Sequence, residues 1–117
     1  GWWATAKRDV RARVEEERKR AGIVETDPSW VLIELALSSR SRLAIVQLQD
    51  VLGLGSEARM NLPATFGRNW QWRLEPEQLT RDHARALREA TGRWRRLPPG
   101  VATEAAGSSR RRRRRSR

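Results

Sequence analysis

The segment Leu43–Leu74 constrains the fold of this chain more than any other. It begins with a short apolar run, Leu43–Val46, and continues through a polar stretch with glycines that closes on Trp70 and Trp72. A short apolar run directly after a helical segment is typical of a parallel β-strand covered on both faces. The backbone groups of such a strand need neighbouring strands, and the rest of the chain supplies none. We therefore expect the chain to be the terminal part of a larger α/β sheet or barrel.

Helical patterns precede this strand. From about residue 4 to residue 21, Ala6, Val10 and Val14 recur on one face, and Gly22 suits a helix C-cap. The supporting charge pairs at helical spacing are Glu15 with Lys19 and Glu16 with Arg20.

Two further helices complete the pattern. Asp27-Pro28 is a helix start signal, and the apolar residues between Trp30 and Leu37 predict a largely buried helix that ends near Ser39. A last helix is predicted over residues 80–95. His83 is expected to pack on the apolar face of this helix as an ordinary helix residue. That face consists of Leu79, His83, Leu87, Ala90 and Trp94.

Composition excludes several kinds of site. The chain has 117 residues, no cysteine and one histidine, so we expect one domain or part of one, without disulfides, a metal site or a cofactor. No apolar run approaches the roughly 18 residues of a membrane span, and the first residues do not resemble a signal peptide. We expect a soluble, cytoplasmic protein without membrane partners. The opening on Gly1-Trp2-Trp3 indicates that further sequence preceded it.

The net charge of +11 is concentrated at one end. Arg110–Arg115 and Arg117 carry seven of these charges, which leaves +4 for residues 1–109. A run of like charges that follows glycine and serine residues predicts a disordered extension. We therefore divide the chain into residues 1–97 and a basic tail, residues 98–117. An alternative is a small nucleic-acid-binding protein that acts through Arg110–Arg117. However, no base-reading motif is present, so any such binding is expected to be non-specific.

The sequence LQDVLGLGSEARMN, from Leu48 to Asn61, followed by NWQWR, from Asn69 to Arg73, resembles the C-terminal region of the 4-α-glucanotransferases of glycoside hydrolase family 77. In that family a Thr-His-Asp-Asn segment is closely followed by Gly-Trp, and this chain opens at Gly1-Trp2-Trp3. The resemblance covers about residues 1–97. It implies a (β/α)8 barrel of which this chain would supply the last helix–strand–helix units.

The resemblance also implies an activity. Such enzymes transfer segments of α-1,4-glucans, or maltooligosaccharides, to an acceptor glucan or glucose by retaining double displacement. That reaction needs two carboxyl groups roughly 5 Å apart. In the family the catalytic aspartate, glutamate and second aspartate lie upstream of the Gly-Trp position. We therefore expect no catalytic residue in this chain and predict that it is inactive alone.

The family resemblance instead assigns the segment after the strand to substrate contact. Barrel active sites lie at the carboxyl ends of the strands, where amide, charged and aromatic side chains can bind sugar hydroxyls and ring faces. The candidate substrate-binding residues are Asn61, Arg59, Asn69 and Trp70.

Structural roles compete with functional ones in this segment. Asp50 and Glu57 could form a carboxylate pair, but we favour Asp50 orienting loop groups and Glu57 pairing with a basic residue such as Arg59. Trp72 is expected to pack on the barrel, and Arg73 is expected to form a structural ion pair. Three positions depart from the family pattern, where Pro or Gly is usual: Gln47, Ala64 and Arg68.

Overall fold

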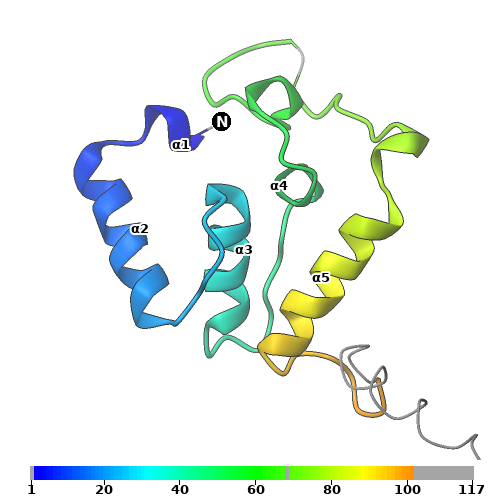
Figure 1. The fold of residues 1–117 in the computed structure, drawn as a ribbon. Coiled ribbons are helices and arrows are strands. Elements are labelled where there is room, and N and C mark those ends of the chain that lie inside the picture. Colours follow the sequence, from blue (N-terminus) through cyan, green and yellow to red (C-terminus); the bar gives the residue numbers. More distant parts are fainter. Residues whose placement is uncertain (1, 68, 102–117) are drawn as a thin grey trace, which may run out of the picture.

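The computed structural model describes residues 2–67 and 69–101. The predicted tail residues Arg110–Arg117, and Arg68, lie outside them. Every regular element of the described part is helical (Figure 1). The elements are α1 (Trp2–Thr5), α2 (Arg8–Arg20), α3 (Pro28–Ser38), α4 (Leu48–Val51), the 3-10 turns η1 (Ser56–Ala58) and η2 (Pro76–Gln78), and α5 (Arg81–Arg93).

The first predicted helix is divided between α1 and α2. The chain turns between them, and Arg11 of α2 donates hydrogen bonds back to the carbonyl oxygens of Ala4 at 2.8 Å and Ala6 at 3.0 Å. Those carbonyls therefore have partners although the helix is interrupted. At the other end, Gly22 has φ 69°, and the N–H of Ile23 donates to the carbonyl of Arg18 at 3.0 Å. This Schellman ending confirms the predicted glycine cap.

The ion pairs along α2 differ in part from those predicted. Lys19 Nζ lies 3.6 Å from Glu15, as expected, but the closer partner of Glu15 is Arg18, at 2.7 Å. Arg20 pairs with Glu17 at 2.6 Å, so the predicted pairing of Arg20 with Glu16 is wrong. The hydrogen bond from Arg18 lowers the pKa of Glu15 from 4.5 to about 2.

Helix α3 begins as predicted and forms the centre of the core. The Asp27 carboxylate accepts hydrogen bonds from the backbone N–H groups of Ser29 and Trp30, at 3.0 and 3.1 Å. Helix α3 contacts α2, α4 and α5 (Figure 1). The buried core residues are Ile33, Leu37, Val51 and Ala90, and the half-buried Trp30, Ala44, Val46, Leu48, Leu87 and Trp94 pack against them.

A charged residue is buried beside this core. The Glu34 side chain is 5% exposed and forms a salt bridge with Arg93, whose side chain is 49% exposed. Its second oxygen accepts a hydrogen bond from Trp94 Nε1 at 3.1 Å. Glu34 therefore ties the end of α5 to α3, with both carboxylate oxygens hydrogen-bonded.

The predicted strand over Leu43–Val46 is wrong for this structure. The segment is unpaired, and no strand occurs in residues 2–67 and 69–101. Its side chains nevertheless alternate: Leu43 is 72% and Ile45 81% exposed, whereas Ala44 and Val46 pack on the core. The physical reason is that a β-ladder requires a neighbouring strand to accept and donate hydrogen bonds, and the described residues supply none.

Helix α5 begins with a reciprocal cap. The Thr80 N–H donates to His83 Nδ1 at 3.2 Å, in the arrangement of a capping box. His83 therefore has a structural role, as expected, although it acts through this cap more than through packing. After α5, Arg96 donates to the carbonyls of Leu37 at 2.6 Å and Ser39 at 2.7 Å, which fixes the end of α5 against the end of α3.

Candidate binding site

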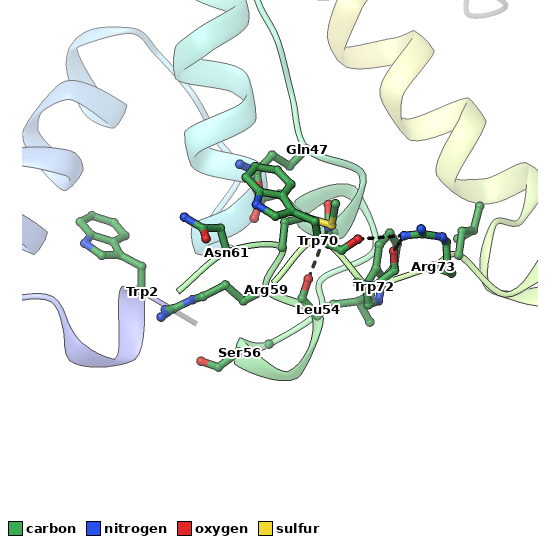
Figure 2. Close-up of a pocket in the computed structure, with 15 residues that line it drawn as sticks. Trp2, Gln47, Leu54, Ser56, Arg59, Asn61, Trp70, Trp72 and Arg73 are labelled. Atoms are coloured by element: carbon green, nitrogen blue, oxygen red, sulfur yellow. Dashed lines mark hydrogen bonds between the residues drawn. The ribbon is translucent and has the colours of Figure 1, made fainter. Parts of the chain in front are cut away.

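A cavity of about 790 Å³ lies where the segment after Val46 folds back on itself (Figure 2). Three of the four predicted binding residues, Arg59, Asn61 and Trp70, line it. The other lining residues are Trp2, Gln47, Gln49, Asp50, Leu54, Gly55, Ser56, Ala58, Met60, Trp72, Arg73 and Leu74. The cavity thus combines indole rings with amide, guanidinium and carboxylate groups.

Short turns and backbone hydrogen bonds shape the part of the cavity that is formed by α4 and η1. After α4, the N–H of Leu54 donates to the carbonyl of Gln49 at 2.9 Å, and Gly53 adopts φ 66°. Glycine accepts this left-handed conformation without the steric penalty that a side chain brings. The Gln49 amide then donates to the Ala58 carbonyl at 3.4 Å, which joins α4 to η1.

Glu57 holds the turn that leads into η1. Its carboxylate accepts a hydrogen bond from the Gly55 N–H at 2.7 Å. Its own backbone N–H and that of Gly55 lower the pKa of Glu57. The predicted pairing of Glu57 with Arg59 is therefore replaced by a local backbone cap, which leaves the Arg59 side chain directed along the cavity (Figure 2).

Asp50 and Glu57 face different cavities. Asp50 lines the 790 Å³ cavity, whereas Glu57 lines a neighbouring cavity of about 780 Å³ and is bonded to Gly55. A retaining glycosidase-type reaction needs two carboxyl groups that face one substrate bond. This arrangement gives no support to a carboxylate pair in this part of the chain.

Asn69 differs from the other three predicted binding residues. Its side-chain oxygen accepts from the N–H of Leu62 at 2.8 Å, and its amide nitrogen donates to the Thr65 carbonyl at 3.1 Å. It lines the neighbouring cavity. The amide therefore closes the loop between Leu62 and Asn69, and in this structure it is committed to that loop.

Trp70 has an unusual backbone conformation. Its φ is 64°, in the left-handed region that bulky residues rarely adopt, and its N–H donates to the Met60 carbonyl. Trp70 is 64% exposed beside the cavity, whereas Trp72 is half-buried and lines the same cavity. Strained backbone of this kind concentrates at functional sites, which makes Trp70 the strongest single candidate here.

Arg73 fixes the conformation that presents Trp70. Its guanidinium donates to the carbonyls of Trp70 at 3.1 Å and Trp72 at 2.9 Å (Figure 2). The predicted ion pair of Arg73 is thus replaced by hydrogen bonds to backbone carbonyls. The role remains structural.

The positions that depart from the family pattern also lie in this region. Gln47 lines the cavity, and Ala64 adopts φ 61°. The family pattern usually has glycine where this chain has Ala64. Ala64 therefore occupies a backbone conformation that glycine tolerates better. Arg68 lies outside the described residues.

Trp2 is a lining residue from a distant part of the chain that the sequence did not predict. It is 47% exposed and lies far from Trp70 in the sequence. The available signal was the pair of large apolar side chains Trp2 and Trp3 at the start of the chain.

Among residues 2–67 and 69–101, no group of three histidine, cysteine, aspartate or glutamate side chains is placed to hold a metal ion. In the same ranges, no helix has the length and apolar character needed to cross a membrane.

The sequence matches known proteins across most of its length. The family model for 4-alpha-glucanotransferases, glycoside hydrolase family 77, matches residues 1–80. A 4-alpha-glucanotransferase of Thermus thermophilus is 42% identical over 99 residues, which are 80% of this chain and 20% of that protein. A chloroplastic/amyloplastic 4-alpha-glucanotransferase of Arabidopsis thaliana is 46% identical over 74 residues, 63% of this chain and 12% of that protein.

A third relative is similar over a shorter range. The 4-alpha-glucanotransferase of Synechocystis is 62% identical over 50 residues, which are 43% of this chain and 10% of that protein. The chain belongs to glycoside hydrolase family 77. It spans about a fifth of the length of the Thermus relative, so it corresponds to one part of such a protein.

Proposed function

We propose that the full-length protein containing this chain is a 4-α-glucanotransferase, and that this chain supplies part of its glucan-binding site. The protein would transfer α-1,4-glucan segments to an acceptor glucan or glucose by retaining double displacement. The observation that carries the proposal is the 790 Å³ cavity, where Arg59, Asn61 and Trp70 meet inside the region that matches the family.

The chemistry of the cavity suits a sugar. The Asn61 amide can both donate to and accept from hydroxyl groups, and Arg59 can donate to several sugar oxygens. The exposed indole of Trp70 can cover the C–H face of a glucose ring. Asn69 would contribute by holding the loop that carries Trp70.

We further propose that this part belongs to a (β/α)8 barrel. The segment Leu43–Val46 lies between α3 and α4, and α3 and α5 contact each other. Its inward residues Ala44 and Val46 pack on the helical core, and its other face, with Leu43 and Ile45, is exposed. A barrel strand has this arrangement, with helices outside and an apolar interior layer on the opposite face.

The position of the cavity agrees with the same architecture. Most of its lining residues follow the carboxyl end of Leu43–Val46, where barrel enzymes place their active sites. The family resemblance places the catalytic aspartate, glutamate and second aspartate upstream of Gly1. The roles of this chain would then be to bind and orient the glucan.

Disproportionation of maltotriose tests this proposal. The full-length protein should convert maltotriose into glucose and longer maltooligosaccharides, whereas this chain alone should leave it unchanged. Transfer by the isolated chain would show that its own carboxylates suffice, contrary to the proposal. No transfer by the folded full-length protein would contradict the assigned activity.

The cellular location stays a prediction. The sequence indicates a cytoplasmic protein, while the Arabidopsis relative is named as chloroplastic/amyloplastic. Fractionation of the native host, with detection of the full-length protein, distinguishes the two locations.

A further inference from the structure

We propose that Trp2 forms a second aromatic wall of the glucan site, on the opposite side of the cavity from Trp70. This inference rests on the proposed function and deepens it, because it adds a binding residue from a segment remote in sequence. Trp2 and Trp70 both line the 790 Å³ cavity, and Figure 2 shows Trp2 on the α1 side, with Arg59 and Asn61 between the two indoles in this view.

The exposure of Trp2 fits a binding surface. Trp2 is a large apolar residue, yet it is 47% exposed, and it lines a cavity that also contains polar groups. Two indoles separated by an amide and a guanidinium can cover apolar C–H faces while the polar groups bind hydroxyls. The chemical class that fits is a glucan of several linked glucose units.

The local structure holds Trp2 in place. Its carbonyl accepts a hydrogen bond from Thr5 Oγ1 at 3.0 Å, which closes the single turn of α1. The ring of Trp3 lies 5.9 Å from that of Trp2, in a tilted arrangement that aromatic pairs favour. Each contact reduces the conformational freedom of Trp2.

Arg11 connects this aromatic pair to α2. Its guanidinium lies over the Trp3 ring, 5.8 Å from the centroid, and donates to the carbonyls of Ala4 and Ala6. A cation over an indole face is attracted by the ring quadrupole. Arg11 is therefore a positioning residue, because it supports Trp3 and the backbone of α1 and thereby the orientation of Trp2.

The expected effect follows from the area that a sugar would cover. A glucose ring that covers about 50 Å² of indole surface gains roughly a tenfold tighter binding. Trp2→Ala in the full-length protein should therefore weaken maltohexaose binding, measured by calorimetry, about tenfold. KM for maltotriose should rise with little change in kcat, because the contact stabilises the bound substrate and the transition state equally.

Matched variants separate this effect from a general loss of structure. Trp2→Phe keeps an aromatic face and should restore most of the affinity. Leu79→Ala removes an apolar side chain of similar exposure, 45%, outside both cavities, and should leave the affinity unchanged. As a measurement that does not depend on the alanine variant folding, the ¹⁹F resonance of 5-fluorotryptophan at Trp2, assigned through Trp2→Phe, should shift when maltohexaose is added.

The outcomes distinguish this inference from the proposed function. Unchanged maltohexaose affinity in Trp2→Ala, or an unmoved Trp2 resonance while the wild-type protein binds and disproportionates, would overturn the second wall alone. A folded wild-type protein that neither binds maltohexaose nor disproportionates maltotriose would overturn both.

Discussion

Removal of the Glu34 carboxylate should destabilise the α3–α5 core more than any other single charge removal in the described residues. Glu34 is buried, and its two oxygens serve Arg93 and Trp94 Nε1. Its deletion leaves a guanidinium without its partner and an indole N–H without its acceptor. Breaking a buried ion pair typically costs 3–5 kcal/mol.

The expected magnitude lies at the lower end of that range. The Arg93 side chain is 49% exposed, so water can solvate it after the carboxylate is removed. We therefore expect Glu34→Ala to lower the free energy of unfolding by about 3 kcal/mol. Glu34→Gln keeps a carbonyl oxygen for Trp94 and loses the charge, so it should cost about 1.5 kcal/mol.

Urea unfolding followed by far-UV circular dichroism measures these differences. Glu16→Ala is the matched control, because Glu16 is an exposed glutamate on α2, and its removal should change stability by less than about 0.5 kcal/mol. A double-mutant cycle with Trp94→Phe should give a coupling energy of about 1 kcal/mol. If Glu34→Ala is no more destabilising than Glu16→Ala, the central role of Glu34 is refuted.

Three further outcomes are expected. Ala64→Gly should raise stability by about 0.5–1 kcal/mol in thermal unfolding, because relief of the φ 61° strain exceeds the added freedom of the unfolded chain; a lower melting temperature would contradict this. The folded pKa of Glu15 is about 2, below its ordinary 4.5, so the stabilisation from Glu15 is complete above pH 4.5 and is lost as pH falls toward 2. Glu15→Gln should flatten the dependence of unfolding stability on pH in this range, and an unaltered dependence would argue against the Arg18 contact. Deletion of Arg110–Arg117 should lower the slope of log affinity against log salt for DNA by up to about 6, and a retained slope would place the binding in residues 1–109.

Local signals in the sequence predicted the end of α2 and the start of α3. Asp27-Pro28 and Gly22 each act within one turn of the chain, so these caps depend on neighbouring residues and not on distant contacts. The family resemblance likewise identified the segment that forms the cavity, and Arg59, Asn61 and Trp70 lie along it.

Pairing partners were harder to predict, because they depend on tertiary geometry. Leu43–Val46 has a strand pattern, but a ladder requires a neighbour that the described residues do not supply. Glu57 and Arg73 were each expected in ion pairs and bind backbone groups instead, since these lie closer in the folded loop. Glu34 was visible as a lone charge in an apolar helix, yet its partners Arg93 and Trp94 are about 60 positions away.

The kinetics of maltotriose disproportionation by full-length variants test the account most directly. We predict that Asn61→Ala raises KM by about tenfold, the loss of one hydrogen-bonding side chain to sugar, and that Asp50→Asn keeps kcat within a few fold. A fall of kcat by about a thousandfold or more in Asp50→Asn would place a catalytic carboxylate in this chain. An unchanged KM in Asn61→Ala would show that the cavity does not hold the glucan, and either result would contradict the account.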